Sequence, residues 1–245
     1  MLQNLNYSQE GDWISLDRQF LNHQVTISNI KILLGNNESL ATAYLNKCIY
    51  SIAIGSNDYL NNYFLPQFYP TRRIYNQEQY ATIIVQQLSQ QLLLGPLKIA
   101  LFGLGFLGYT LVELTMCRNN SSCVYNINNA VALFNDKVVT LVNNFNNNLT
   151  NAKFIYINTI EISLSSSTSE GSIITNVPCC EVLKNPQPQA KCISFGTACS
   201  NRSQYSFWDA VHPTEVGYAV YGGRVYRAQS PADAYPHDIE HLSQS

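Results

Sequence analysis

Charged side chains are scarce in this sequence: Asp, Glu, Lys and Arg make up 12% of the 245 residues, and the formal net charge is −2. No basic run or stripe occurs, although a protein that binds a polyanion needs a dense Lys and Arg face. Long apolar runs are also missing, since stretches such as residues 99–107 are too short to cross a bilayer and are broken by glycines. The sequence therefore predicts no nucleic acid partner and no transmembrane segment.

Apolar and aromatic residues, by contrast, are plentiful. Hydrophobic residues make up 46% of the chain, with 16 Tyr and 10 Phe, which is enough to bury a sizeable core and argues against disorder. We find no internal repeat and no long low-complexity linker. The sequence therefore predicts one domain over residues 1–245.

The order of apolar patterns predicts the fold class. Continuous β-branched and aromatic runs are typical of parallel strands covered on both faces, and they occur at Cys48–Ile54, Lys98–Leu104 and Ala152–Thr159. Apolar residues at helical spacing predict helices at Gln77–Leu94, with a stop at Gly95-Pro96, at Ile127–Leu149 and at Glu215–Ala228. This alternation is typical of a doubly wound α/β sheet. Residues 160–206 are predicted to be irregular and clamped by disulfides.

The cysteines suggest an oxidising compartment. Seven are present, at positions 48, 117, 123, 179, 180, 192 and 199, and no CxxC pair predicts a zinc site. This pattern favours two or three disulfides, with Cys48 as a spare thiol in a buried strand. Six triplets match the N-glycosylation acceptor, at Asn6, Asn37, Asn119, Asn120, Asn148 and Asn201, although an Asn- and Ser-rich chain also produces such triplets by chance.

The N-terminal sequence conflicts with that compartment. MLQNLNYSQEGDW has neither the basic start nor the apolar core of a signal peptide. Two expectations follow: either an export signal is missing from this chain, or the cysteines stay reduced.

Three loops at strand ends are candidates for a site, because ligands bind beyond the carboxyl ends of parallel strands. The first strand is followed by Gly55-Ser56-Asn57-Asp58. The second is followed by Gly103–Gly108, which matches GxGxxG but lacks the acidic strand end expected about 20 residues later in a dinucleotide fold. We therefore interpret these glycines as a tight turn.

The third candidate is the segment that contains Asp209 and His212. A carboxylate three residues before an imidazole can contact it, fix its tautomer and stabilise its protonated form. Alone, the pattern is more typical of a surface ion pair. Together with a Gly-x-Asn-Asp loop at the end of a buried strand, it favours a catalytic pair.

These segments resemble a known family. The strings SIAIGSNDYLNNYF, KIALFGLG, AKFIYIN and NRSQYSFWDAVHPTEVGYAV, and the tail AQSPADAYPHDIEHL, are similar in sequence and order to plant GDSL-type esterase/lipases of the SGNH hydrolase superfamily. The resemblance implies a three-layer α/β/α sandwich with a doubly wound parallel sheet. It also implies a secreted carboxylic ester hydrolase that needs no metal or organic cofactor.

The resemblance also assigns roles to individual residues. Asn57 takes the place of the asparagine that donates to the oxyanion, and Asp209 and His212 take the place of the catalytic Asp-x-x-His pair. In such a site the amide of Asn57 would stabilise a tetrahedral intermediate. The imidazole of His212 would deprotonate the serine nucleophile and then protonate the leaving alcohol.

The chain departs from the family pattern at the nucleophile. No Gly-Asp-Ser triplet occurs, and Gly11-Asp12-Trp13 ends in an indole that cannot attack an ester. We therefore expect an N-terminally truncated family member that lacks the serine and the N-terminal strands. The strand at Cys48–Ile54 should then have an unpaired, aggregation-prone edge. The isolated chain should be poorly soluble and inactive.

A second departure concerns the loop after the second strand. The family usually continues Pro-x-Gly-Cys there, whereas this chain has Phe106-Leu107-Gly108-Tyr109. Cys123 would then lack its usual partner, and Cys117 could replace it.

Three functions remain open on the sequence. The first is hydrolysis of acyl esters, lipids or acylated cell-wall components. The second is a catalytically inactive fragment or pseudoenzyme that binds a ligand through aromatic residues, although those residues are more simply explained as core: Tyr59, Tyr63, Phe64, Phe207 and Trp208. The third is a non-functional gene remnant, against which the intact Asn57, Asp209 and His212 argue.

Overall fold

A four-stranded sheet forms the centre of the molecule. The computed structural model describes residues 14–93, 98–166, 173–183 and 190–245. The strands lie in the order β1 (Tyr50–Ile52), β2 (Lys98–Phe102), β3 (Lys153–Ile157) and β4 (Ala234–Tyr235). The first three are parallel, as predicted, and β4 pairs with β3 in the antiparallel direction. The sequence pattern did not reveal β4 because it is only two residues long.

Both faces of the sheet are buried, which explains the continuous apolar runs. Ile99 and Leu101 belong to the core on one face, whereas Ala100 between them belongs to the core on the other. Phe154 and Ile155 alternate in the same way on β3. Since successive side chains of a strand point to opposite faces, a strand covered on both sides needs apolar residues throughout.

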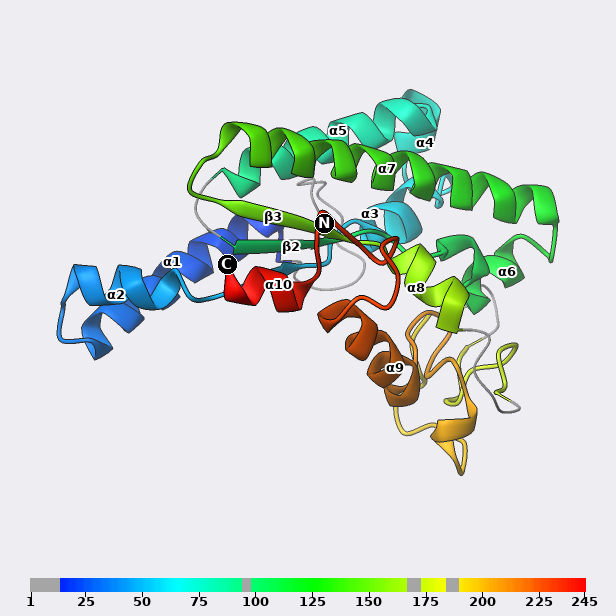
Figure 1. Cartoon of the computed structure of the whole chain (residues 1–245). Coiled ribbons are helices and arrows are strands. Elements are labelled where there is room, and N and C mark those ends of the chain that lie inside the picture. The colour runs from blue at the N-terminus through cyan, green and yellow to red at the C-terminus, as the bar shows by residue number, and fades with distance from the viewer. Residues whose placement is uncertain (1–13, 94–97, 167–172, 184–189) are drawn as a thin grey trace.

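Helices cover the two faces as separate layers (Figure 1). On one side lie α5 (Gln77–Leu92) and α7 (Ser121–Asn148), and on the other lie α8 (Thr159–Ser166), α9 (Glu215–Tyr226) and α10 (Ile239–Gln244). The predicted three-layer α/β/α arrangement is confirmed. The Gly95-Pro96 stop predicted after α5 lies outside the described residues. The helix α7 begins before the predicted Ile127 because the side chain of Asn120 caps it by accepting from the Cys123 N–H.

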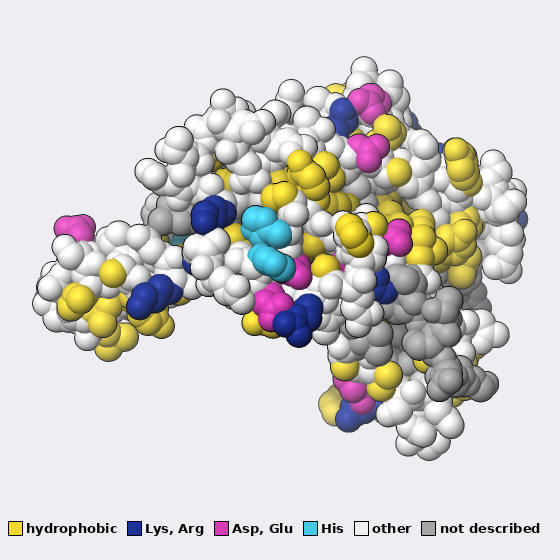
Figure 2. Space-filling model, in the orientation of Figure 1, with side chains coloured by type: hydrophobic (Ala, Val, Ile, Leu, Met, Phe, Trp, Pro, Cys, Tyr) yellow, Lys and Arg dark blue, Asp and Glu magenta, His cyan; other side chains and the backbone are white. Residues whose placement is uncertain are grey.

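The remaining helices are short or peripheral, with α1 and α2 forming an arm beyond the sheet (Figure 1). They are α1 (Leu16–Leu33), α2 (Glu38–Leu45), α3 (Ser56–Asp58), η1 (Tyr59–Tyr63), α4 (Thr71–Ile74), η2 (Leu107–Tyr109), α6 (Leu111–Met116) and η3 (Arg202–Gln204). Apolar side chains are visible on the surface of the arm in Figure 2. On α1, the apolar Leu21, Val25 and Leu33 are exposed.

The strand β1 lies at the edge of the sheet, as expected from the sequence. Within the described ranges, β2 is the only strand that pairs with it. The ring of His23 on α1 approaches that of Tyr50 on β1, with centroids 5.1 Å apart. The N-terminal arm therefore contacts the first residue of this edge strand.

Three disulfides crosslink the chain. They join Cys117 to Cys123, Cys179 to Cys199 and Cys180 to Cys192. The first is the substitute pairing expected for Cys123. The thiol of Cys48 is free, as predicted, but the residue lies before β1 and is half-buried, so its placement in a buried strand was wrong.

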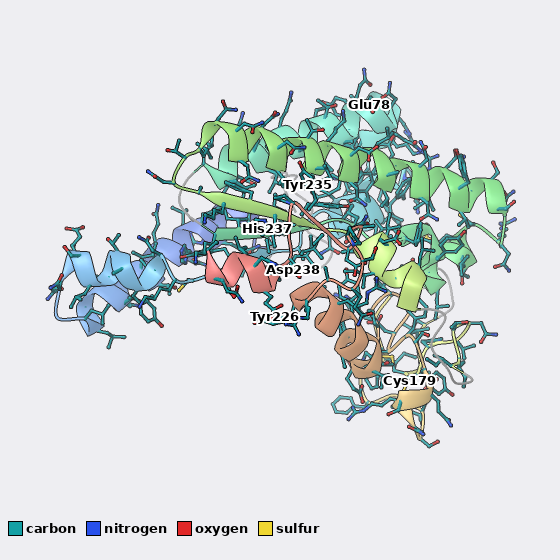
Figure 3. All side chains as sticks on the ribbon, viewed as in Figure 1. Glu78, Cys179, Tyr226, Tyr235, His237 and Asp238 are labelled. Carbon is teal, nitrogen blue, oxygen red and sulfur yellow. A yellow bond between two sulfur atoms is a disulfide. The ribbon has the colours of Figure 1, made fainter. Side chains whose placement is uncertain are left out.

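The predicted irregular stretch 160–206 needs one correction. Its first residues continue the helix α8, which begins at Thr159 and buries the apolar Ile162 against the sheet. The described part that follows is held by the two later disulfides and by isolated bridges. Figure 3 places Cys179 in this part of the chain, close to α9.

Candidate active site

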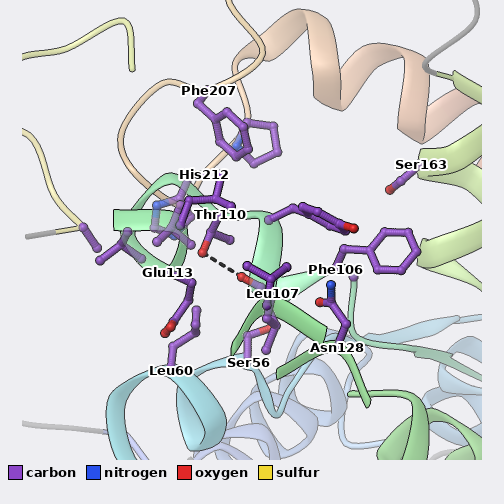
Figure 4. A pocket seen from close by; sticks show the side chains of 18 of the residues that line it. Ser56, Leu60, Phe106, Leu107, Thr110, Glu113, Asn128, Ser163, Phe207 and His212 are labelled. Atoms are coloured by element: carbon purple, nitrogen blue, oxygen red, sulfur yellow. Dashed lines mark hydrogen bonds between the residues drawn. The ribbon is translucent and has the colours of Figure 1, made fainter. Parts of the chain in front are cut away.

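The loops that follow the parallel strands open onto one large groove. Its cavity volume is about 2930 Å³. Asn57 from the segment after β1, Gly105 from the loop after β2 and Thr159 at the start of α8, just after β3, all line it, as does His212 from the loop before α9. The sheet therefore brings the predicted Asn57 and His212 to a common cavity. Figure 4 shows Ser56 and Leu60 on the opposite side of this pocket from Phe207 and His212.

Asp209 and His212 are in direct contact. The Nδ1 atom of His212 lies 2.7 Å from Oδ2 of Asp209. The carboxylate is buried, with 8% of the side chain exposed, whereas 58% of the imidazole is exposed toward the groove and solvent. A carboxylate at this distance holds the proton on Nδ1 and leaves Nε2 unprotonated. The two predicted residues are therefore in hydrogen-bond contact.

The backbone of the same loop fixes the Asp209 carboxylate. Its Oδ1 accepts hydrogen bonds from the N–H groups of Val211 at 2.8 Å and His212 at 2.6 Å. Charge-assisted bonds of this kind are stronger than neutral ones. Because both oxygens are occupied, the carboxylate cannot rotate away without losing a contact.

Two neighbouring segments hold the loop in place. The Val112 N–H on α6 donates to the Ala210 carbonyl at 3.1 Å, between the two predicted residues. On the other side, the N–H groups of Cys179 and Cys180 each donate at 2.9 Å, to the carbonyls of Phe207 and Trp208. The predicted catalytic pair is therefore supported by α6 and by the disulfide-bonded segment.

Asn57 lies in a short helical turn, and the backbone enters this turn through Gly55. Gly55 has φ of 118°, a conformation that other residues rarely adopt, and a Cβ there would lie 3.2 Å from the Phe134 ring. Asn57 is exposed within the groove, and its Oδ1 accepts from Nδ2 of Asn61 at 3.1 Å. The Asn61 side chain comes from the π-helix η1, a type of turn that is common at functional sites.

The GxGxxG match is explained by packing. A Cβ at Gly103 would lie within 2.3 Å of the Tyr156 hydroxyl on β3, so no side chain fits there. The Leu104 N–H, which follows, donates to Oδ1 of the buried Asn135 at 2.7 Å. These contacts agree with a tight turn between packed elements.

The predicted aromatic cluster divides between core and groove. Tyr59, Tyr63 and Phe64 are buried in the main core, which agrees with the simpler interpretation. Phe207 lines the groove.

Sequence reasoning missed a buried carboxyl group in the groove. Glu113 on α6 is 3% exposed, and burial raises the pKa of its carboxyl group to about 7. It lines the groove and lies close to Leu60 in Figure 4. Its position in a short helix outside the recognised motifs gave no signal for it.

Sequence reasoning also missed a second Asp-x-x-His contact. Nδ1 of His241 lies 2.6 Å from Oδ1 of Asp238. This carboxylate caps α10 and also accepts from the Ala228 N–H. Figure 3 places Asp238 beside His237, and neither Asp238 nor His241 lines the groove. An Asp-x-x-His spacing therefore also occurs where the aspartate caps a helix and has no place in the groove.

The described residues contain no cluster of three or more His, Cys, Asp or Glu side chains arranged to hold a metal ion. Among them, no helix combines the length and the apolar character that a membrane span needs.

Comparison with known proteins identifies the family. Residues 4–225 match the model of the GDSL-like Lipase/Acylhydrolase family. The chain is 42% identical to GDSL esterase/lipase At1g29670 of Arabidopsis thaliana, over 96% of this chain and 66% of that protein. It is 40% identical to GDSL esterase/lipase At4g18970 of the same plant, over 96% of this chain and 67% of that protein. The chain therefore belongs to the GDSL lipase/acylhydrolase family, and it spans about two thirds of the length of these relatives.

Proposed function

We propose that the chain functions in the hydrolysis of acyl esters, with His212 as the general base and acid, Asp209 as its orienting carboxylate and Asn57 as a donor to the oxyanion. The observation that carries the proposal is the 2.7 Å contact between His212 Nδ1 and a buried Asp209 carboxylate at the edge of the groove. Membership of a lipase/acylhydrolase family supports it independently.

Each proposed role follows from the available atoms. The attacking hydroxyl is that of the serine of the family motif or of water. Nε2 of His212 takes its proton as the oxygen bonds to the ester carbonyl carbon, and returns the proton to the alcohol oxygen as the C–O ester bond breaks, while Asp209 stabilises the imidazolium between the two steps. Meanwhile Nδ2 of Asn57 donates to the negative oxygen of the tetrahedral intermediate, because Oδ1 of the same amide is already bonded to Asn61.

No serine of this chain is assigned as the nucleophile. The family motif places the serine in a Gly-Asp-Ser triplet, and no such triplet occurs among the 245 residues. The acid–base pair and the oxyanion donor are the parts of the machinery that we propose for this chain. The apolar side chains of the groove, including Leu60, Phe68 and Leu107, suit acyl or lipid esters.

Hydrolysis of 4-nitrophenyl butyrate and laurate tests the proposal. We expect any hydrolysis by the parent chain to fall by about 10⁶-fold in His212→Ala, as is typical when the histidine of a triad is removed. His241→Ala provides a matched control, since it removes an imidazole from the second Asp-x-x-His contact. Measurable hydrolysis by the parent chain that His212→Ala leaves unchanged would contradict the proposal.

A second candidate function is ligand binding without turnover, which the missing Gly-Asp-Ser triplet favours. It predicts that a fluorophosphonate probe labels no serine and that 4-nitrophenyl esters are not hydrolysed. The groove would nevertheless bind non-hydrolysable lipid analogues. Labelling of any serine would exclude this function.

We also propose that the chain is an exported glycoprotein. Three disulfides support an oxidising compartment, and the acceptors Asn148 and Asn201 are exposed. A mass decrease after endoglycosidase treatment of the protein from its natural source would support this proposal, whereas an unmodified mass would contradict it. The acceptor at Asn6 lies outside the described residues.

A further inference from the structure

Glu113 carries a carboxyl group that has no hydrogen-bond partner among the described residues. Although the residue is 97% buried, no side chain or backbone group among the described residues lies within hydrogen-bonding distance of its carboxyl oxygens. Buried polar groups in native proteins nearly always have a partner. Since Glu113 lines the groove, the space in front of it is where such a partner would bind.

The surroundings of Glu113 are unfavourable for a bare charge. Apolar side chains, including Leu60 and Met116, line the groove with it, and Phe64 lines a smaller cavity of about 450 Å³ that Glu113 also lines. Arg72 favours the ionised form of Glu113, yet the two make no ion pair within 4.0 Å, and the guanidinium carbon lies 5.8 Å from the centroid of the Phe64 ring. Burial outweighs this attraction. A neutral hydrogen-bonding group suits this position better than a second charge.

The position of Glu113 on α6 indicates which part of an ester substrate it would face. The preceding residue, Val112, donates its N–H to the Ala210 carbonyl in the loop of Asp209 and His212. In ester hydrolysis, the histidine returns its proton to the oxygen of the leaving alcohol. The alcohol part of the ester is therefore the part closest to the loop that α6 supports.

We propose that Glu113 is a specificity residue that hydrogen-bonds a free hydroxyl group on the alcohol part of the substrate. The groove then selects esters of polyhydroxy alcohols over simple alkyl esters. This inference rests on the proposed function, since it uses the same groove and the same orientation of the ester. It adds a polar anchor to a pocket that otherwise binds by apolar contact.

A matched pair of non-hydrolysable ligands tests the proposal without requiring turnover. The probes are 1-O-dodecylglycerol, which has two free hydroxyls, and its 2,3-di-O-methyl derivative, which has none. Calorimetry below the critical micelle concentration measures both dissociation constants for the full chain. We expect the dihydroxy ligand to bind about tenfold more tightly, the usual effect of a hydrogen bond to a charged or buried carboxyl group.

Two substitutions at Glu113 then test whether this residue causes the preference for the dihydroxy ligand. Glu113→Leu should abolish it, because a leucine side chain cannot accept a hydrogen bond. Glu113→Gln keeps an acceptor of the same shape and should retain most of it. Glu181→Leu serves as the control, since Glu181 is exposed and outside the groove. Thermal unfolding of each variant confirms that it is folded.

The outcomes separate this inference from the proposed function. If both ligands bind with equal affinity, or if Glu113→Leu keeps the preference, the role of Glu113 is wrong and the lipid groove stands. If neither ligand binds the parent chain, both the specificity role and the acyl-ester groove are wrong.

Discussion

The side chain of Asn61 donates from Nδ2 to Oδ1 of Asn57 at 3.1 Å. An amide has one acceptor end and one donor end, so this contact fixes which end of Asn57 remains available. The available end is the NH₂ group, which is the end that an oxyanion requires. Asn61 therefore acts as a positioning residue for the proposed donor, four residues along the same helical turn.

The first prediction reverses the contact between Asn57 and Asn61. In Asn61→Asp, the introduced carboxylate accepts from the NH₂ group of Asn57 and turns it away from the groove. Butyrate, a product with the same charge as the oxyanion, should then bind more weakly than to Asn61→Ala. Titration of butyrate, followed by the side-chain amide NMR signal of Asn57, measures the effect.

A charge control accompanies this experiment. Asn119 also lines the groove and is exposed, so Asn119→Asp adds the same negative charge without touching Asn57. If the Asn119→Asp and Asn61→Asp chains lose equal affinity for butyrate, charge repulsion explains the result and the positioning role is wrong.

The second prediction concerns the tautomer of His212. In Asp209→Asn, Oδ1 can still accept the two backbone N–H groups that it accepts now, which places the new NH₂ group against Nδ1. The ring should then carry its proton on Nε2, the reverse of the parent, and any hydrolysis should fall by about 10⁴-fold. Nitrogen-15 NMR of the ring nitrogens reports the tautomer even without turnover.

Asp238→Asn is the matched control for that substitution. It alters the second Asp-x-x-His contact, where the carboxylate caps α10. We expect it to lower stability by about 1 kcal/mol, as for other N-cap losses, and to leave the tautomer of His212 unchanged.

The third prediction follows from the raised pKa of Glu113. Between its ordinary value of 4.5 and about 7, the folded chain binds a proton at this carboxyl group that the unfolded chain releases. The contribution of this group to the unfolding free energy is therefore fully present below pH 4.5 and is lost as the pH rises to about 7. The total loss is about 3 kcal/mol.

Glu113→Gln removes that titration. Relative to the parent, the variant should gain unfolding free energy as the pH rises from 4.5 to 7 and then reach a plateau. Urea unfolding at several pH values gives the difference, in which the other titrating groups cancel. A difference that does not change with pH would contradict the prediction.

The fourth prediction concerns the disulfide between Cys117 and Cys123, which joins the end of α6 to the start of α7 with a sequence separation of 6. Replacing both cysteines with serine should lower the unfolding free energy by about 2 kcal/mol, according to the loop-entropy relation. Cys48→Ser, which removes the free thiol, should change stability by less than about 0.5 kcal/mol. Equal losses in the two variants would contradict a stabilising crosslink.

The sequence predicted those parts of the fold whose residues repeat a simple physical pattern. Ile99 and Leu101 face one core and Ala100 the other, so β2 had to be apolar throughout. Gln77–Leu92 was equally readable, since its apolar residues follow helical spacing. By contrast, β4 and α10 are too short to show a period, and α8 begins within a strand-like run at Thr159.

The site could be predicted only where local spacing creates the contact. Asp209 and His212 are three residues apart, and a loop brings them together. Glu113 gave no such signal, because Leu60 and Phe64, each of which lines one of the two cavities that Glu113 lines, come from a distant part of the chain. The same spacing at Asp238 and His241 produced a helix cap instead, so distinguishing the two contacts required the groove.

Two crosslinks anchor the segment that supports the proposed catalytic loop. The N–H groups of Cys179 and Cys180 donate to the carbonyls of Phe207 and Trp208, and each cysteine is itself tied to a partner 20 or 12 residues further along. Reduction would release this segment from its covalent partners, so we expect the backbone support of the loop that carries Asp209 and His212 to weaken under reducing conditions.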